Sequence, residues 1–366
     1  MSETKQEQLL ALAAVSGELS VAAVERLLPH GEYRRKVVGT LTRQKLLHSY
    51  RKDGVRGWRL TKHGKHLLMM QNPARYAALF TGDKHTNAYP SELPRRLRLH
   101  RISETLAMMQ LGGIRFHLDE KTMLFHSVPV SPPMMPAFYL AKEVQALGDA
   151  AIKIRHARMV GLLLAEETYD LVYNTGTSVL RWTPASELRA SVLLGEYLGH
   201  QLGWLPYRQA EPGALMLGES IELAEKLLTG TGGYHRQGFR LDGTFSRFCY
   251  LPNTPQGDAV LWLLTWPDAA AFLNRMLAGV FRPKPALGNF PFDAATDSGA
   301  PVLFAWDFDM ERIRRFSLGV RERDLHGVVA AFEFQCEVLR RYLGDVAEIR
   351  PLSLQKTWEM IRREKL

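Results

Sequence analysis

The fold of the N-terminal region is decided by residues 31–66, which read GEYRRKVVGTLTRQKLLHSYRKDGVRGWRLTKHGKH. Apolar residues recur at helical spacing over 32–44 and predict a helix there. Residues 46–60 then alternate between apolar and polar types on either side of a turn at Asp53-Gly54. Alternation around such a dipeptide is typical of two antiparallel strands, so a β-hairpin is predicted after the helix.

Further helices are predicted on both sides of this stretch. Upstream, apolar residues over 9–15 have helical spacing, and Ser20 is placed to cap a second helix over 21–28. Downstream, Thr61 is placed to cap a last helix that runs through Met70. Three helices, a hairpin and another helix follow the order of a winged helix-turn-helix, which we therefore predict for residues 1–71.

The positive charge of the chain is concentrated in the same stretch. Residues 31–66 hold eleven Lys or Arg and two acidic residues, a local charge of +9. The whole chain has 47 basic and 38 acidic residues, so 36 of each remain elsewhere. A basic module on a neutral body is the charge distribution expected of a protein that binds a polyanion.

The polar face of the predicted third helix and the hairpin tip would meet double-stranded DNA. In winged helices this helix enters the major groove, and the hairpin contacts backbone phosphates. The predicted DNA-binding residues are Tyr33, Arg34, Arg35, Lys36, Thr40, Arg43, Gln44, Lys45, Arg51, Lys52 and Arg56. Some winged helices bind proteins instead, and basic helix faces are often merely solvated. The concentration of charge favours DNA.

Beyond this module the chain predicts a mixed α+β protein. Residues 72–96, rich in Pro, Gly, Asn and Asp, are predicted to be a linker with a short helix near 74–80. An α/β domain is expected over 97–205, and a second α/β or α+β domain over 206–366. Apolar hairpins are expected at 160–173 and at 245–265.

Composition narrows the class of protein further. No run of about eighteen apolar residues is present, so no membrane contact is expected. The two cysteines are far apart and lie in no metal-binding motif, as in a reduced, cytoplasmic protein. A homodimer is a further expectation, because single winged helices bind weakly and many of their sites are palindromic.

A metal-dependent nuclease needs an acidic residue followed by an acid-x-Lys triplet on the next strand. Glu143, Asp149, Lys153 and Asp170 lie in the region where such a site would form. However, no acid-x-Lys triplet occurs on either strand of the hairpin predicted at 160–173. No catalytic residue is therefore predicted from this region.

Asp307 and Asp309 follow a predicted strand at 302–306. Alternate carboxylates at a strand end can share a divalent cation. Asp309 is also placed to cap the helix that begins at Met310, with Asp307 solvated, and this interpretation is favoured. The sequence thus predicts no metal site and no cofactor.

The order of the parts resembles the replication-relaxation proteins of bacterial conjugative elements and plasmids. The similarity lies in the N-terminal module, in the step Leu99-His100-Arg101-Ile102-Ser103-Glu104, and in the body over 138–198. It covers about half of the chain and includes nothing after Gly213. The resemblance implies a restriction-endonuclease-like body and a mobile-element protein that acts at an origin of replication or transfer, with a relaxase or another transfer protein as a partner.

The leading hypothesis is a non-enzymatic, sequence-specific double-stranded DNA-binding protein of a mobile genetic element, acting in plasmid or conjugative-element replication or transfer. Two alternatives remain open. One is a Mg²⁺-dependent nuclease of restriction-endonuclease-like fold. The other is a winged-helix transcriptional regulator.

Overall fold

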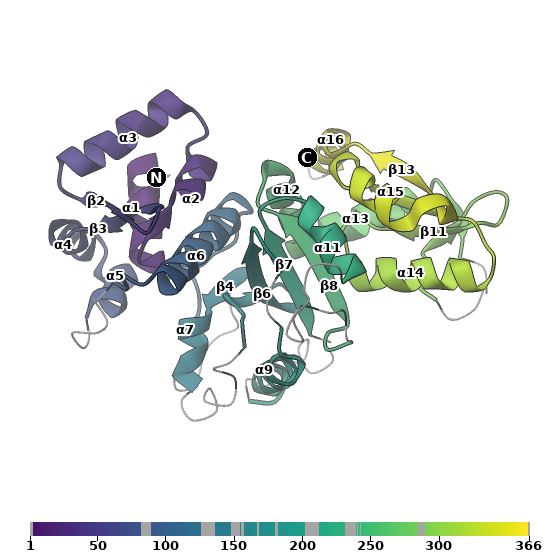
Figure 1. Ribbon diagram of the computed structural model, residues 1–366, viewed down its shortest axis with the longest axis horizontal. Helices are drawn as coiled ribbons and strands as arrows, with labels where there is room; N and C mark the ends of the chain where they lie inside the picture. The colour runs from purple at the N-terminus through teal and green to yellow at the C-terminus, as the bar shows by residue number, and fades with distance from the viewer. Residues whose placement is uncertain are drawn as a thin grey trace. The chain divides into compact units, whose positions relative to one another are not determined.

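The computed structural model (Figure 1) contains helices and three β-sheets, which confirms the predicted α+β class. The chain divides into two compact units, residues 1–138 and 139–366. The structure describes residues 3–81, 89–125, 136–147, 154, 157–166, 168–179, 182–201, 212–230, 239, 241, 243–284 and 290–364.

The N-terminal unit alternates helices with a small antiparallel sheet of order β1-β3-β2. Its elements are α1 (Lys5–Ser16), β1 (Leu19–Ser20), α2 (Val21–Leu27), α3 (Gly31–Arg43), β2 (Leu47–Lys52), β3 (Val55–Leu60), α4 (Lys62–Gln71), α5 (Pro73–Phe80) and α6 (Leu93–Leu111). The predicted helix and hairpin positions are found here to within a few residues.

Short polar side chains set the boundaries of these elements. The Ser20 hydroxyl accepts the Ala23 N–H at the start of α2, and Thr61 accepts the Gly64 N–H at the start of α4. These are the two caps predicted from the sequence. Asp53 and Gly54, with φ of 52° and 76°, make the turn between β2 and β3, as primed hairpin turns require.

Helix α6 is part of the N-terminal unit. It packs against α1, α2 and β1, and its residues Leu106, Ala107, Met108 and Met109 are fully buried. The segment 72–96, predicted as a linker, contains α5, which confirms the short helix expected near 74–80, and also the first turn of α6. The apolar face of α6 therefore completes the core that the first seventy residues leave open.

The first sheet of unit 2 has the order β4-β5-β6-β7-β8. The β5–β6 pair is antiparallel, as the predicted hairpin at 160–173 requires, and β6, β7 and β8 are parallel. The strands and their accompanying helices are β4 (Ala137–Leu140), α7 (Ala141–Val144), η1 (Gln145–Leu147), β5 (Gly161–Leu164), β6 (Tyr169–Gly176), α9 (Pro184–Glu196), η2 (Tyr197–Gln201), β7 (Gly213–Gly218), α11 (Glu222–Thr229) and β8 (Arg247–Pro252).

A second sheet, of order β13-β12-β11-β10-β9, follows in the same unit, and β11, β12 and β13 run parallel. Its elements are α12 (Pro255–Thr265), α13 (Pro267–Ala278), β9 (Arg282–Pro283), β10 (Ala294–Ala295), β11 (Pro301–Phe304), α14 (Met310–Glu322), β12 (Gly327–Phe332), η3 (Glu333–Gln335), α15 (Cys336–Leu343), η4 (Gly344–Val346), β13 (Ala347–Leu352) and α16 (Leu354–Glu364). The two sheets are joined where the Tyr250 N–H of β8 donates to the Phe308 carbonyl, at 3.2 Å.

The hairpin expected at 245–265 is wrong in its second half. Residues 247–252 form β8, but 255–265 form α12. Thr254 caps this helix and Pro255 occupies its first turn. A short buried apolar run fits either a strand or a helix, so periodicity alone does not separate the two.

The interpretation of the Asp307–Asp309 pair is half right. Asp309 caps α14, because its Oδ1 accepts the N–H groups of Glu311 at 3.0 Å and Arg312 at 3.4 Å. Asp307 is not solvated: its side chain is 14% exposed and lies 3.8 Å from the Arg312 guanidinium.

Within the described parts of the chain, no helix has the length and apolar character that crossing a bilayer requires.

Candidate nucleic-acid interface

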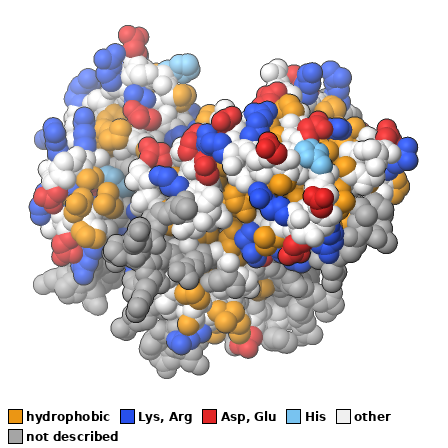
Figure 2. Space-filling model, turned by 45° about the vertical axis from the view of Figure 1, so that its right-hand side comes forward, with side chains coloured by type: hydrophobic (Ala, Val, Ile, Leu, Met, Phe, Trp, Pro, Cys, Tyr) orange, Lys and Arg blue, Asp and Glu red, His pale blue; other side chains and the backbone are white. Residues whose placement is uncertain are grey.

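The eleven residues predicted to bind DNA lie on α3, on the turn after it and on the β2–β3 hairpin. None of them is buried. Arg34 and Thr40 are half-buried, and the other nine are exposed. The structure thus leaves these side chains on the surface of the N-terminal unit, where Figure 2 (left) shows several exposed Lys and Arg side chains.

Helix α3 has one buried and one exposed side. Val37 and Leu41 are buried, with 4% and no exposure. Arg35 and Lys36 are exposed, and the Arg35 side chain is 80% exposed with its guanidinium 3.9 Å from Glu32. An exposed pair at this distance adds little stability, so Arg35 is available to a ligand.

Arg34 differs from its neighbours. Its guanidinium lies 3.1 Å from the Glu25 carboxylate of α2 and donates to the Leu28 carbonyl at 3.3 Å. These contacts join α3 to α2. Arg34 therefore positions the helix, while Arg35 and Lys36 carry its free cationic surface.

The hairpin carries the second group of exposed cations. Arg51 and Arg56 stand opposite each other in the β2–β3 register, and Lys52 lies one residue nearer the turn. The Arg56 guanidinium is 5.0 Å from the centre of the Trp58 ring, which restrains its side chain.

Arg59 departs from the charge pattern seen in the sequence. It is 5% exposed, and its Nε and an Nη atom donate to Glu18 Oε2 at 2.8 and 2.6 Å. Of the eleven Lys and Arg residues in the stretch 31–66, Arg59 is therefore paired with a carboxylate in the interior of the protein. No local sequence pattern indicates this pair, because Glu18 is an isolated acid 41 residues away.

Glu18 lies in the turn between α1 and β1 and has no exposed surface. Besides Arg59, it accepts from Arg96 of α6 at 2.5 Å, and His100 Nε2 lies 2.9 Å from its Oε1. Burial raises the pKa of this carboxyl, but hydrogen bonds from His100, Arg96 and Arg59 outweigh burial and lower the pKa to about 2. The group is ionised, as a buried charge with several donors can be.

Arg96, also without exposed surface, connects this carboxylate to the hairpin. Its guanidinium donates to the backbone carbonyls of Lys52 at 2.9 Å and Val55 at 3.2 Å, on either side of the turn. It also lies 4.5 Å from the centre of the Tyr50 ring. The first turn of α6 thus fixes the position of the hairpin that carries Arg51, Lys52 and Arg56.

Two residues of the step at 99–104 serve the same purpose. His100 contacts Glu18, and the Ser103 hydroxyl accepts the Ser20 N–H at 3.1 Å. Next to these side chains, residue 57 of β3 has to be glycine, because a Cβ atom there would lie only 2.8 Å from His100 Nε2. These contacts give the step a structural role within the N-terminal unit.

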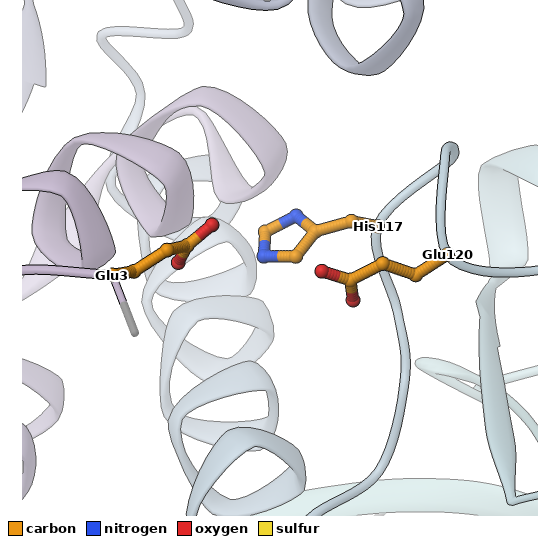
Figure 3. Close-up of side chains that lie close together, drawn as sticks. All are labelled: Glu3, His117 and Glu120. Carbon is orange, nitrogen blue, oxygen red and sulfur yellow. The ribbon is translucent and has the colours of Figure 1, made fainter. Parts of the chain in front are cut away.

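A second charged cluster lies elsewhere in the same unit. Arg75, 8% exposed, donates to Asp119 at 2.7 Å, to Glu120 at 2.6 Å and to Glu3. His117, 5% exposed, lies beside these acids (Figure 3). Burial, with Arg75 nearby, lowers the pKa of His117 to about 3, so its imidazole is neutral at pH 7.

The residues considered for a nuclease site have other partners. The Glu143 carboxylate accepts the Leu140 N–H at 2.8 Å, and Asp170 accepts two hydrogen bonds from Arg247 at 2.7 and 2.8 Å. Asp149 and Lys153 lie outside the described residues. In the described part of unit 2, no three potential metal ligands come together.

No family model, no curated protein and no solved structure matches this chain.

We predict that Glu18→Gln destabilises the N-terminal unit by about 3–5 kcal/mol, because it leaves two buried guanidinium groups without their counter-charge. Urea unfolding of the full chain, followed by hydrogen exchange in peptides from residues 1–138, measures this loss. Glu32→Gln, whose side chain is 96% exposed, is the control and should change stability by less than about 0.5 kcal/mol. Equal stability of the two variants would contradict the prediction.

The lowered pKa of Glu18 also predicts how the stability of the N-terminal unit depends on pH in the acid range. The pKa of Glu18 is about 2 in the folded protein against an ordinary 4.5, so its stabilisation is complete above pH 4.5 and is lost as the pH falls through 2. Hydrogen exchange of unit 1 across this range should show the loss in the wild type. In Glu18→Gln the loss should be smaller and should come only from other carboxyls of the unit whose pKa is lowered, such as Asp119 and Glu7, and an unchanged profile would rule out Glu18 as a source.

Proposed function

We propose that the N-terminal unit is a winged helix-turn-helix that binds double-stranded DNA in a sequence-specific manner. The observation that carries the proposal is that the recognition helix and the wing both present exposed cations. On α3 these include Arg35, Lys36 and Arg43, and on the hairpin Arg51 and Arg56. Cations on such a helix and hairpin are the ones that meet bases and phosphates in this class of domain.

The element order supports the proposal. Helices α2 and α3 follow one another with a short turn, and β2 and β3 pair as a hairpin directly after α3. The strand β1 closes the small sheet by pairing with β3. In this arrangement α3 is the helix that enters the major groove, and β2–β3 is the wing.

The charge distribution favours DNA over a protein partner. The exposed residues of α3 include Tyr33, which is 48% exposed and can stack or hydrogen-bond at a groove. Apart from Tyr33, polar and cationic side chains predominate on this face, as expected of an interface with phosphates. A protein-binding face would carry more exposed apolar and aromatic side chains.

The resemblance to replication-relaxation proteins extends the proposal to the replication or transfer of a plasmid or conjugative element. The step at 99–104 is one of the three parts in which this resemblance lies, and two of its residues, His100 and Ser103, brace the proposed winged helix. A relaxase or another transfer protein is the partner that this role would require.

We predict that the double variant Arg35→Ala, Lys36→Ala binds DNA at least tenfold more weakly at moderate salt, because it removes two exposed cations from the recognition helix. Fluorescence anisotropy measures the affinity for a duplex selected from a random pool. Arg362→Ala, Arg363→Ala, which removes two exposed cations from α16, is the matched control and should bind like the wild type. Failure of the wild type to select any duplex would refute the proposal.

For the wing, Arg51→Ala, Arg56→Ala should weaken binding to the selected duplex and to an unrelated duplex by the same factor. Phosphate contacts carry no sequence information, and each one contributes about 0.9 to the slope of log affinity against log salt. The slope should therefore become shallower by about 2 in this variant. An unchanged slope would mean that the hairpin does not touch the phosphates.

A further inference from the structure

Three potential metal ligands come together at the second charged cluster of the N-terminal unit. Glu3 precedes α1, while His117 and Glu120 lie in the segment after α6. One ligand atom of each lies within 4.8 Å of the other two. Figure 3 shows the imidazole ring between the two carboxylates.

The buried imidazole of His117 is the feature of this cluster that indicates a bound ligand. Its ring is 5% exposed, and neither ring nitrogen has a hydrogen-bond partner among the residues that the structure describes, the fully buried Nδ1 included. Buried polar atoms nearly always have a partner, and a missing ion or water is a common reason when they do not. An imidazole and carboxylates are also common ligands of a metal ion in proteins.

The charges of the cluster leave room for a cation. Arg75 is bonded to Glu3, Asp119 and Glu120, so one guanidinium faces three carboxylates. Its hydrogen bonds to Glu3 and Glu120 go to the Oε1 atom of each, and the second oxygen of each carboxylate is available to a metal. A divalent ion would balance the two remaining negative charges.

We propose that Glu3, His117 and Glu120 bind one divalent transition-metal ion, with Zn²⁺ as the best match. One nitrogen and two carboxylate oxygens suit zinc, and water would complete a tetrahedral set. The imidazole disfavours Mg²⁺ and Ca²⁺, which take oxygen ligands. This site is independent of the DNA-binding surface.

Zinc bond lengths place tetrahedral ligand atoms about 3.4 Å apart, which lies inside the 4.8 Å that bounds the separations of these three ligand atoms. Because Glu3 adjoins α1 and His117 follows α6, the ion would tie the start of α1 to the segment after α6. The expected effect is a stabilised N-terminal unit.

Titration calorimetry of the full chain, freed of metal with a chelator, tests the site with ZnCl₂ alone. We expect one Zn²⁺ per chain, together with stronger hydrogen-exchange protection in peptides that cover 3–16 and 114–121. Glu3→Gln should weaken binding at least tenfold, and His117→Gln should abolish it. His63→Gln, which alters an exposed histidine of α4, should bind like the wild type.

Glu3→Gln keeps the test decisive if His117→Gln does not fold, because Glu3 is partly exposed and precedes the first helix. Absence of zinc binding by the wild type would overturn the proposal and leave the cluster as an ion-pair network around Arg75. Equal binding by wild type and Glu3→Gln would assign the zinc to other residues and would overturn it as well.

Discussion

The architecture of the N-terminal unit depends on one buried carboxylate. Glu18 has no exposed surface, and it is held by Arg59 of the sheet and by Arg96 and His100 of α6. Removing a charge from water costs several kcal/mol, and direct hydrogen bonds to oppositely charged groups must offset that cost. Because Glu18 lies in the turn after α1 and its partners come from the hairpin and from α6, the carboxylate is satisfied only when all three segments are in place.

This arrangement divides the basic residues of the stretch 31–66 into two kinds. Arg59 points into the protein and neutralises Glu18, and Arg34 joins α3 to α2. The exposed cations of α3 and the hairpin keep their charge available to a ligand. Structural and surface arginines look the same in a sequence, since what separates them is a partner distant in the chain. The local charge of +9 is therefore an upper bound on the charge that the surface presents.

Much of the fold could be predicted because its signals are local. Ser20 and Thr61 cap helices through contacts three residues away, and the turn at Asp53-Gly54 needs only its own backbone. The network of Glu18 could not be predicted, because its partners lie 41 to 82 residues away. Asp307 is a different case, because its ion-pair partner Arg312 is near in the sequence, and only the folded structure shows that the carboxylate is 14% exposed. The strand expected at 259–265 failed for a different reason, since a short apolar run fits a helix as well as a strand and its periodicity does not separate the two.

Helix α6 explains why the N-terminal unit does not end at residue 71. Its first two turns supply Arg96 and His100 to the Glu18 network, and the segment after its last turn supplies Asp119 and Glu120 to Arg75. With 19 residues it is about 28 Å long, so the two charged networks brace the unit at well-separated points. A chain that stopped before α6 would keep Glu18 and Arg59 but lose Arg96, and it would expose the core that α6 covers. The β2–β3 hairpin and its exposed cations would then lack the guanidinium that binds its backbone carbonyls. The position of the proposed DNA-binding surface is thus set by a helix that contributes none of its predicted contacts.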